Sequence, residues 1–452
     1  TYLEPILLRN ATMRGTQTRF STEYLDHVQD ADGVTTTVLD RITGQQYRIR
    51  SKYLIAGDGA RTKVGVDAGL EWEGRMDIAG SMNITFKADL EALVGHRPSV
   101  LYWVVNEGGN VGGIGAGLVR MVRPWDEWLI VWGYDITQPP PRLDDAAALE
   151  IIYELLGTRD IEVEIQGYSL WGVNEMWGTK LSNGRVFGIG DAIHRHPPSN
   201  GLGSNTSVQD SYNLAWKLAA VLGGYAGPAL LDTFTAERAP VAKQIVQRAN
   251  KSSREFGGFF EVMSGIDERK RNTPAGAAKR QALAEAMELK NYEFNAHGVE
   301  LGQFYTSSAV ISDGSPKPST PGRDPELYYT PSTAPGAPLP HAWVGDEHRK
   351  VSTLDLAPST RFTLFTGIAG EAWAPAAEAA AARLGVPLGA VVIGPGREVT
   401  DLYFDWERLR GIPEDGAILV RPDKIVAWRA TSLAEDPEAA VADALRQVLS
   451  LA

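Results

Sequence analysis

The chain has 452 residues, 43% of them hydrophobic, and a formal net charge of −12 at pH 7. The acidic surplus argues against nucleic acid as a partner, because a phosphate-binding face needs an excess of basic residues. The absence of cysteine excludes disulfides, thiolate metal sites and thiol catalysis. No apolar stretch is as long as a membrane span, so we expect a soluble, cytoplasmic protein of roughly three domains.

The first 75 residues are predicted to form part of one domain. Their hydrophobic pattern predicts a helix over residues 4–15, then strands over residues 18–29, 34–39 and 46–55. Asp58 and Gly59 follow the last of these strands closely.

An antiparallel sheet is predicted over residues 76–180. Its strands are expected at residues 78–87, 100–106, 111–122, 128–134 and 161–171, with a hairpin loop at 106–110 and a helix at 144–157. Four aromatic residues recur in two neighbouring strands: Tyr102, Trp103, Trp132 and Tyr134. They either wall an apolar pocket for an aromatic substrate or form an ordinary aromatic sheet core.

The most informative segment is the loop at residues 190–205, which follows a short apolar strand and precedes a helical pattern. Asp191 at the strand end can accept hydrogen bonds from ribityl or ribose hydroxyls. Glycines at 201 and 203 let the backbone approach a flat ring closely. The N–H groups of residues 202–205 lie at the helix start, where negative charge is favoured. This order predicts a site for a polyhydroxylated, phosphorylated cofactor.

His194 and His196 flank Arg195 in the same loop. They lack a third ligand at metal spacing, so we predict no metal site. His194 is a candidate catalytic residue that relays a proton to cofactor or substrate, since imidazole titrates near neutrality. A hydrogen-bonded structural histidine is the alternative.

Helices are predicted to dominate residues 207–287, with interruptions at 224–228 and 237–240, and Glu237 and Arg238 are expected to pair with each other. A linker rich in Pro, Ser, Thr and Gly follows at residues 313–340. The remaining residues alternate strands and helices, which predicts an α/β layer over 341–452. Its expected strands are 362–365, 389–393 and 417–428, and its expected helices are 374–384 and 437–451.

The run His194-Arg195-His196-Pro197-Pro198, followed by Gly201-Leu202-Gly203-Ser204-Asn205, resembles the FAD-dependent aromatic hydroxylases. It is most similar to their phenol and 2,4-dichlorophenol hydroxylase branch. Residues 53–62 are similar to the family element that contacts the FAD pyrophosphate and helps NADPH binding, although Gly65 stands where the family has arginine. The resemblance runs from Leu3 to the end of the chain.

This resemblance implies an α/β fold with a FAD-binding Rossmann-like domain, an inserted antiparallel β-sheet substrate domain and a thioredoxin-like C-terminal domain. The expected boundaries are 1–75 and 181–312 for the FAD-binding part and its helices, 76–180 for the sheet, 313–340 for the linker and 341–452 for the last domain. Without cysteines, that last domain is expected to serve packing and association in a homo-oligomer. The implied cofactor-binding residues are Asp58, Gly190, Asp191, Pro197, Gly201, Leu202, Gly203, Ser204 and Asn205.

The implied activity is hydroxylation of a phenolic ring by molecular oxygen through a flavin hydroperoxide, with FAD as cofactor and NADPH or NADH as electron donor. The alternatives are a flavin-dependent halogenase or epoxidase of related fold, or a non-catalytic remnant that mediates assembly. The family's opening strand, Gly-x-Gly-x-x-Gly turn and helix are not found, so we expect an N-terminal portion to be missing from this sequence.

Overall fold

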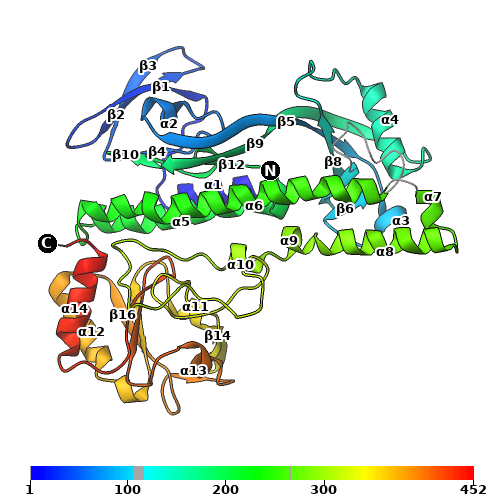
Figure 1. Cartoon of the computed structure of the whole chain (residues 1–452). Coiled ribbons are helices and arrows are strands. Elements are labelled where there is room, and N and C mark those ends of the chain that lie inside the picture. The colour runs from blue at the N-terminus through cyan, green and yellow to red at the C-terminus, as the bar shows by residue number, and fades with distance from the viewer. Residues whose placement is uncertain (1, 105–116, 264–265, 452) are drawn as a thin grey trace.

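The structure is a computed structural model that describes residues 2–104, 117–263 and 266–451. Two long helices, α5 (Gly203–Leu222) and α6 (Thr233–Met263), run through the middle of the molecule (Figure 1). Most strands of the N-terminal half lie above these helices in this view, and the C-terminal α/β part lies below them. The predicted mixed α/β fold is confirmed.

The N-terminal segment begins with helix α1 (Leu3–Met13) and contributes strands to two small sheets. The first sheet has the order β1 (Thr22–Gln29), β2 (Val34–Asp40), β3 (Gln46–Ser51). In the second sheet, β11 (Val186–Gly188) pairs parallel with β4 (Leu54–Ala56) and antiparallel with β10 (Ser182–Asn183). The short helix α2 (Lys63–Asp67) follows β4.

A six-stranded sheet forms the next layer, in the order β12-β9-β5-β8-β7-β6. Its strands are β5 (Glu71–Lys87), β6 (Leu101–Val104), β7 (Gly117–Arg123), β8 (Glu127–Tyr134), β9 (Glu164–Lys180) and β12 (His194–Arg195). One face shares a core with α4 (Asp145–Leu156), and the short helix α3 (Glu91–Val94) follows β5. The sheet therefore reaches beyond the predicted limits of 76 and 180 at both ends. The predicted hairpin loop at 106–110 lies outside the described residues.

The predicted break at 237–240 is wrong, because α6 continues through Pro240. The predicted pairing of Glu237 with Arg238 is also wrong. Glu237 instead binds Lys217 at 2.7 Å, and Arg238 binds Asp210 at 2.7 Å. Successive helix residues point in different directions, so these two side chains cannot face each other. The missing N–H of Pro240 removes one main-chain hydrogen bond but does not end the helix.

The 3₁₀ turn η5 (Pro228–Asp232) joins α5 to α6. After α6 come α8 (Pro274–Glu288) and the short helices α7 (Ile266–Arg269), α9 (Asn291–Phe294) and α10 (His297–Glu300). Residues 301–342 then contain no helix or strand, and the linker predicted at 313–340 falls within this segment.

The C-terminal part contains two sheets. One has the order β14-β13-β17 and the other β16-β15-β18-β19. Their strands are β13 (Trp343–Asp346), β14 (Arg349–Ser352), β15 (Phe362–Thr366), β16 (Leu388–Val392), β17 (Val399–Asp401), β18 (Ala417–Val420) and β19 (Val426–Ala430). The helices are α11 (Thr353–Leu356), η6 (Ile368–Gly370), α12 (Trp373–Leu384), α13 (Asp405–Leu409) and α14 (Pro437–Val448). Trp216 and Ala220 of α5 share a core with Phe362 and Leu419, so this part packs directly on the long helices.

Among the helices described, none combines the length and apolar character needed to cross a membrane.

Candidate functional site

The two predicted cofactor segments meet at one sheet edge. Strands β4 and β11 run parallel, with Ala56 beside Gly188. The segment with Asp58 follows β4, and the loop with Asp191 follows β11. Carboxyl ends of parallel strands open on the same edge of a sheet, which is where α/β folds place their ligands.

Backbone contacts fix the turn that carries Asp191. Gly190 has a φ of +62°, a conformation that favours glycine. Arg195 Nε donates to the main-chain carbonyl of Asp191 at 2.9 Å, and Trp72 Nε1 donates to that of Ala192 at 2.9 Å. The Asp191 carboxylate itself is exposed and makes no hydrogen bond to any described residue. These contacts fix the backbone of the turn, and the Asp191 carboxylate remains available to accept hydrogen bonds from a ligand.

The start of α5 presents free donors beside this turn. The first main-chain bond of the helix runs from Thr206 N–H to the carbonyl of Leu202 at 2.8 Å. The N–H groups of residues 203–205 consequently have no acceptor in the described parts of the chain. Gly201, in the 3₁₀ turn η4 (Ser199–Gly201), has a φ of +62° and open space where a Cβ would lie. Such a helix start stabilises negative charge.

A cleft of about 490 Å³ lies between this loop and the six-stranded sheet. Its volume falls within the usual range for small-molecule sites, about 300–1,000 Å³. The sheet contributes Arg120, Trp171, Gly172 and Asn174, and the segment after β4 contributes Ala60. The loop side is formed by Asp191, His194, Arg195, His196, Pro198, Gly201, Gly203 and Ser204.

Five of the predicted site residues therefore border the cleft, namely Asp191, His194, Gly201, Gly203 and Ser204. The other predicted cofactor residues, Asp58, Gly190, Pro197, Leu202 and Asn205, are not among its lining residues. Leu202 belongs to a buried cluster with Val241 and Ile245.

The groups at the cleft fit FAD. The free carboxylate of Asp191 is a pure acceptor, which suits ribityl hydroxyls. The free N–H groups at the start of α5 suit the negatively charged edge of a reduced flavin ring. Gly59, with a φ of +82° and nothing within 4 Å of a Cβ position, leaves room for close approach on the β4 side.

Asp58 has a local structural role that sequence reasoning missed. Its carboxylate accepts hydrogen bonds from the N–H groups of Lys63 at 2.8 Å and Val64 at 3.0 Å, and from the hydroxyl of Thr62. It thereby holds the first turn of α2. Contact between Asp58 and FAD stays a prediction.

His194 lies in a buried hydrogen-bond network rather than free in the cleft. Its Nε2 is 2.9 Å from Oδ2 of Asp210, and the main-chain N–H of Gly190 donates to the same oxygen at 3.1 Å. Burial raises the pKa of Asp210, but His194 and Arg238 overcome this effect and leave the pKa below its ordinary value. The structure thus gives His194 a hydrogen-bonded position, and proton relay stays a prediction.

His196 is the second histidine at the cleft. Its Nδ1 donates to the carbonyl of Pro197 at 2.7 Å, and burial lowers the pKa of its imidazole. Its ring stacks on that of His194 with a centroid separation of 6.3 Å. The neutral ring packs the loop from within.

The four predicted substrate aromatics do not share one face of the sheet. Tyr102, Trp132 and Tyr134 pack against the core that includes α4. Trp103 points to the opposite face, where it contacts Phe294 at a centroid separation of 6.0 Å. Consecutive strand residues alternate between faces, so Tyr102 and Trp103 cannot line one wall.

Sequence reasoning missed the sheet residues at the cleft, which are Arg120 of β7 and Trp171, Gly172 and Asn174 of β9. Trp171 belongs to the predicted strand 161–171 and donates from Nε1 to Asn83 at 3.1 Å. Strand register shows which face Trp171 occupies. It pairs with Ser81, whose side chain points away from the core because the next residue, Met82, points into it. This pairing cannot be read from the sequence of one strand alone.

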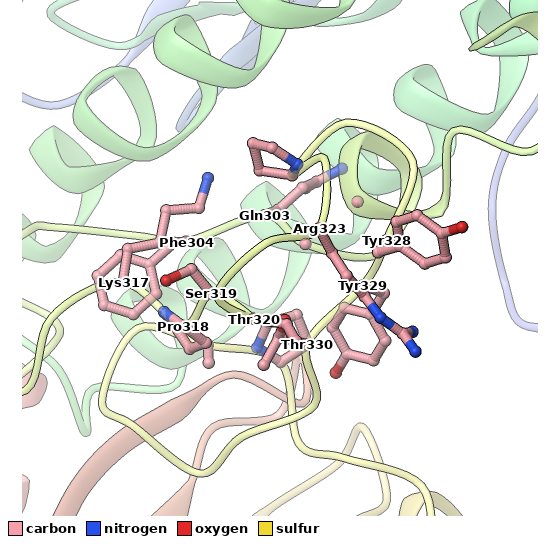
Figure 2. A pocket seen from close by; sticks show the side chains of 15 residues that line it. Gln303, Phe304, Lys317, Pro318, Ser319, Thr320, Arg323, Tyr328, Tyr329 and Thr330 are labelled. Atoms are coloured by element: carbon pink, nitrogen blue, oxygen red, sulfur yellow. The ribbon is translucent and has the colours of Figure 1, made fainter.

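A second, smaller cavity of about 40 Å³ lies in the linker, bordered by Gln303 and Phe304 (Figure 2). Lys317 and Arg323 stand on opposite sides of it, and both are exposed. It holds none of the predicted cofactor residues. The cleft beside Asp191 is the candidate active site, because it brings five of the predicted site residues together.

The chain is similar to known proteins over nearly its whole length. A family described as "FAD binding domain" matches residues 1–249, and one described as "Aromatic-ring hydroxylase, C-terminal" matches residues 332–452. The chain is 56% identical to a phenol 2-monooxygenase of Pseudomonas sp. (strain EST1001), over 98% of this chain and 73% of that protein. It is 50% identical to a 2,4-dichlorophenol 6-monooxygenase of Cupriavidus pinatubonensis, over 99% of this chain and 77% of that protein.

Solved structures show the same similarity. The flavin-dependent monooxygenase PieE in complex with FAD and substrate matches with a TM-score of 0.92 and 39% identity, over 100% of this chain and 79% of that one. Aklavinone-11 hydroxylase with FAD and aklavinone matches with a TM-score of 0.81 and 30% identity, over 99% of this chain and 77% of that one.

Proposed function

Because the chain belongs to the family of FAD-dependent aromatic-ring hydroxylases, we propose that it hydroxylates a phenol in the cleft beside Asp191. The predicted family resemblance and the predicted FAD cofactor are confirmed. The protein is a flavin-dependent aromatic-ring monooxygenase, with NAD(P)H as the electron donor that is typical of this family. The alternative of a non-catalytic assembly protein loses its support.

The observation that carries the proposal is the cleft itself. It places the unpaired Asp191 carboxylate and the free donors at the start of α5 opposite the sheet residues Trp171 and Asn174. In our proposal, Asp191 binds the ribityl chain and residues 203–205 bind the pyrimidine edge of the flavin ring. When bound, FAD takes a hydride from NAD(P)H and activates oxygen for transfer to the aromatic ring.

The substrate is proposed to lie between the flavin and the sheet. Trp171 offers a flat apolar surface to a ring, and Asn174 and Arg120 offer polar contacts. A substrate held between sheet and loop would be shielded from water, which would protect the activated oxygen from wasteful breakdown. The phenol class is supported by the relatives that act on phenol and on 2,4-dichlorophenol.

The finer organisation of the fold is part of the proposal. We assign the parallel strands β4 and β11 to the Rossmann-like FAD-binding domain and the six-stranded sheet to the substrate domain. Strands β15 and β16 are parallel, whereas β18 and β19 are antiparallel to their neighbours. With α12 and α14, this arrangement supports a thioredoxin-like C-terminal domain, for which we propose a role in packing within a cytoplasmic homo-oligomer.

Flavin content and substrate-stimulated NADPH oxidation test the function. The purified protein should show the visible spectrum of bound flavin, and phenol or 2,4-dichlorophenol should raise NADPH oxidation severalfold and yield a catechol. Benzoate, which lacks the hydroxyl, serves as the control and should not yield a hydroxylated product. A colourless protein that does not take up added FAD would contradict the proposal, and a halogenated product formed with chloride would favour the halogenase alternative.

A further inference from the structure

A buried carboxylate of α5 reaches back to the loop that precedes the helix. Asp210 is buried, and its two oxygens accept three hydrogen bonds. Oδ2 accepts from the main-chain N–H of Gly190 at 3.1 Å and from His194 Nε2 at 2.9 Å. Oδ1 accepts from Arg238 Nε at 2.7 Å. One side chain thus joins the glycine before Asp191, a histidine of the loop and helix α6.

This contact determines which nitrogen of His194 carries a proton. An ionised carboxylate only accepts hydrogen bonds, so Nε2 of His194 must be the donor. In the neutral ring, Nδ1 is then the unprotonated nitrogen. Nδ1 is buried and has no partner among the residues described. Asp210 therefore selects one tautomer of a histidine that borders the cleft.

Asp210 is itself held from the other side. Arg238 is buried, and its Nη1 donates to Gln303 Oε1 at 2.9 Å and to Tyr305 Oη at 2.8 Å. The guanidinium neutralises the carboxylate and fixes its position, because charge-assisted hydrogen bonds are short and directional. The loop is consequently anchored to the helix layer through one carboxylate.

We infer that Asp210 is a positioning residue of the FAD site, which holds the Gly190–Asp191 turn and the Nε2-protonated tautomer of His194. The inference rests on the proposed function of the cleft. Gly190 is the residue directly before Asp191, so a shift of its N–H group rotates the Asp191 carboxylate that we assign to the ribityl chain. FAD affinity should therefore depend on Asp210, although Asp210 is not among the residues that line the cleft.

Asp210→Asn tests this role at almost constant size. An asparagine has one accepting end and one donating end, so it cannot accept from Arg238 on one side and from Gly190 and His194 on the other. We expect the dissociation constant of FAD to rise at least about tenfold and the visible spectrum of bound flavin to change. Glu237→Gln is the matched control, because Glu237 is an equally buried carboxylate that does not contact the loop. It should lower stability while leaving FAD affinity unchanged.

The tautomer can be measured in the unmodified holoenzyme. In protein labelled with ¹⁵N-histidine, the His194 resonances, assigned by their loss in His194→Gln, should show a protonated Nε2 and an unprotonated Nδ1. Asp210→Asn should alter that pattern. A wild-type His194 protonated on Nδ1 alone would overturn the inference, even if the variant failed to fold. So would an Asp210→Asn protein with unchanged FAD affinity and unchanged histidine signals. Failure of the wild-type protein to bind FAD would instead refute the proposed function.

Discussion

Asp191 in the loop and Asp210 in the helix that follows it, α5, have carboxylates with opposite surroundings. The Asp191 carboxylate is exposed at the cleft and makes no hydrogen bond to the residues described, whereas Asp210 is buried and accepts three hydrogen bonds. A carboxylate with satisfied oxygens supports structure, and one with unsatisfied oxygens in a cleft is available to a ligand. The environment of each residue, not its type, assigns its role.

Asp191→Ala should release FAD without unfolding the protein. The side chain makes no hydrogen bond to other described residues, so its removal costs little stability. Loss of a charged hydrogen-bond acceptor should weaken FAD binding by about 10- to 100-fold. Titration of the apoprotein with FAD and thermal unfolding measure the two effects. Asp443→Ala, on the exposed face of α14, is the control, and stoichiometric flavin in the Asp191 variant would contradict our assignment.

Sequence alone identifies those site residues that belong to one continuous motif. Asp191 is evident because it follows a strand and precedes a Pro/Gly loop. Asp210 is not, because its partners are 20 and 16 residues away and meet it only when α5 packs under the loop. Asp58 was recognised as part of a motif, but its capping of α2 depends on backbone geometry.

The hydrophobic pattern of the sequence predicts many strands and helices, but tertiary packing decides their faces and their ends. The six-stranded sheet was predictable from alternating hydrophobic residues, but its faces follow from register, which joins distant strands. The small sheet of β13, β14 and β17 escaped prediction because its strands have only three or four residues. Helix α6 shows the same limit, since it continues through Pro240, a residue that locally favours an end or kink of a helix.

Trp171 and Trp132 lie on opposite faces of the six-stranded sheet, so we expect their substitution to have different effects. Trp171 borders the cleft, whereas Trp132 packs against the core that includes α4. Trp171→Leu should raise the KM for phenol severalfold with a small loss of stability. Trp132→Leu should lower the free energy of unfolding by about 2–4 kcal/mol and leave the KM unchanged. Steady-state kinetics and urea unfolding of both variants distinguish the faces, and the reverse result would show that the cleft lies on the other side.

In the whole molecule, one ion network ties the C-terminal part to the long helices. Glu237 of α6 accepts from Lys217 of α5 at 2.7 Å. It also accepts from both terminal nitrogens of Arg421, at 2.6 and 2.9 Å, and Arg421 follows β18 directly. All three side chains are buried. The composition of residues 313–340 predicts a linker, but it gives no sign that charged groups join the parts on either side.

This network predicts how stability changes with pH. Burial raises the pKa of Glu237, but the charges of Arg421 and Lys217 overcome this and leave the pKa well below its ordinary range. A carboxylate with a depressed folded pKa stabilises the protein above its unfolded pKa of about 4.3, and that stabilisation is lost as pH falls. We therefore expect the free energy of unfolding to fall between about pH 5 and pH 3.

Glu237→Gln should flatten this dependence and lower stability at pH 7 by about 3–5 kcal/mol, because it leaves buried cations without their partner. Urea unfolding at several pH values provides the measurement, with Glu378→Gln in α12 as the control. An unchanged slope in the Glu237 variant would show that other carboxylates govern acid unfolding.

The contact between Glu237 and Arg421 limits how such proteins recombine. A chimera that joined these helices to the C-terminal region of a relative would bury the Glu237 carboxylate against whatever residue replaced Arg421. Without a cation there, the hybrid would carry an unpaired charge in its interior, which costs several kcal/mol. A chimera should therefore fold stably only if it keeps both Glu237 and Arg421 or replaces both with apolar residues. The C-terminal region consequently cannot be exchanged without regard to the helices on which it packs.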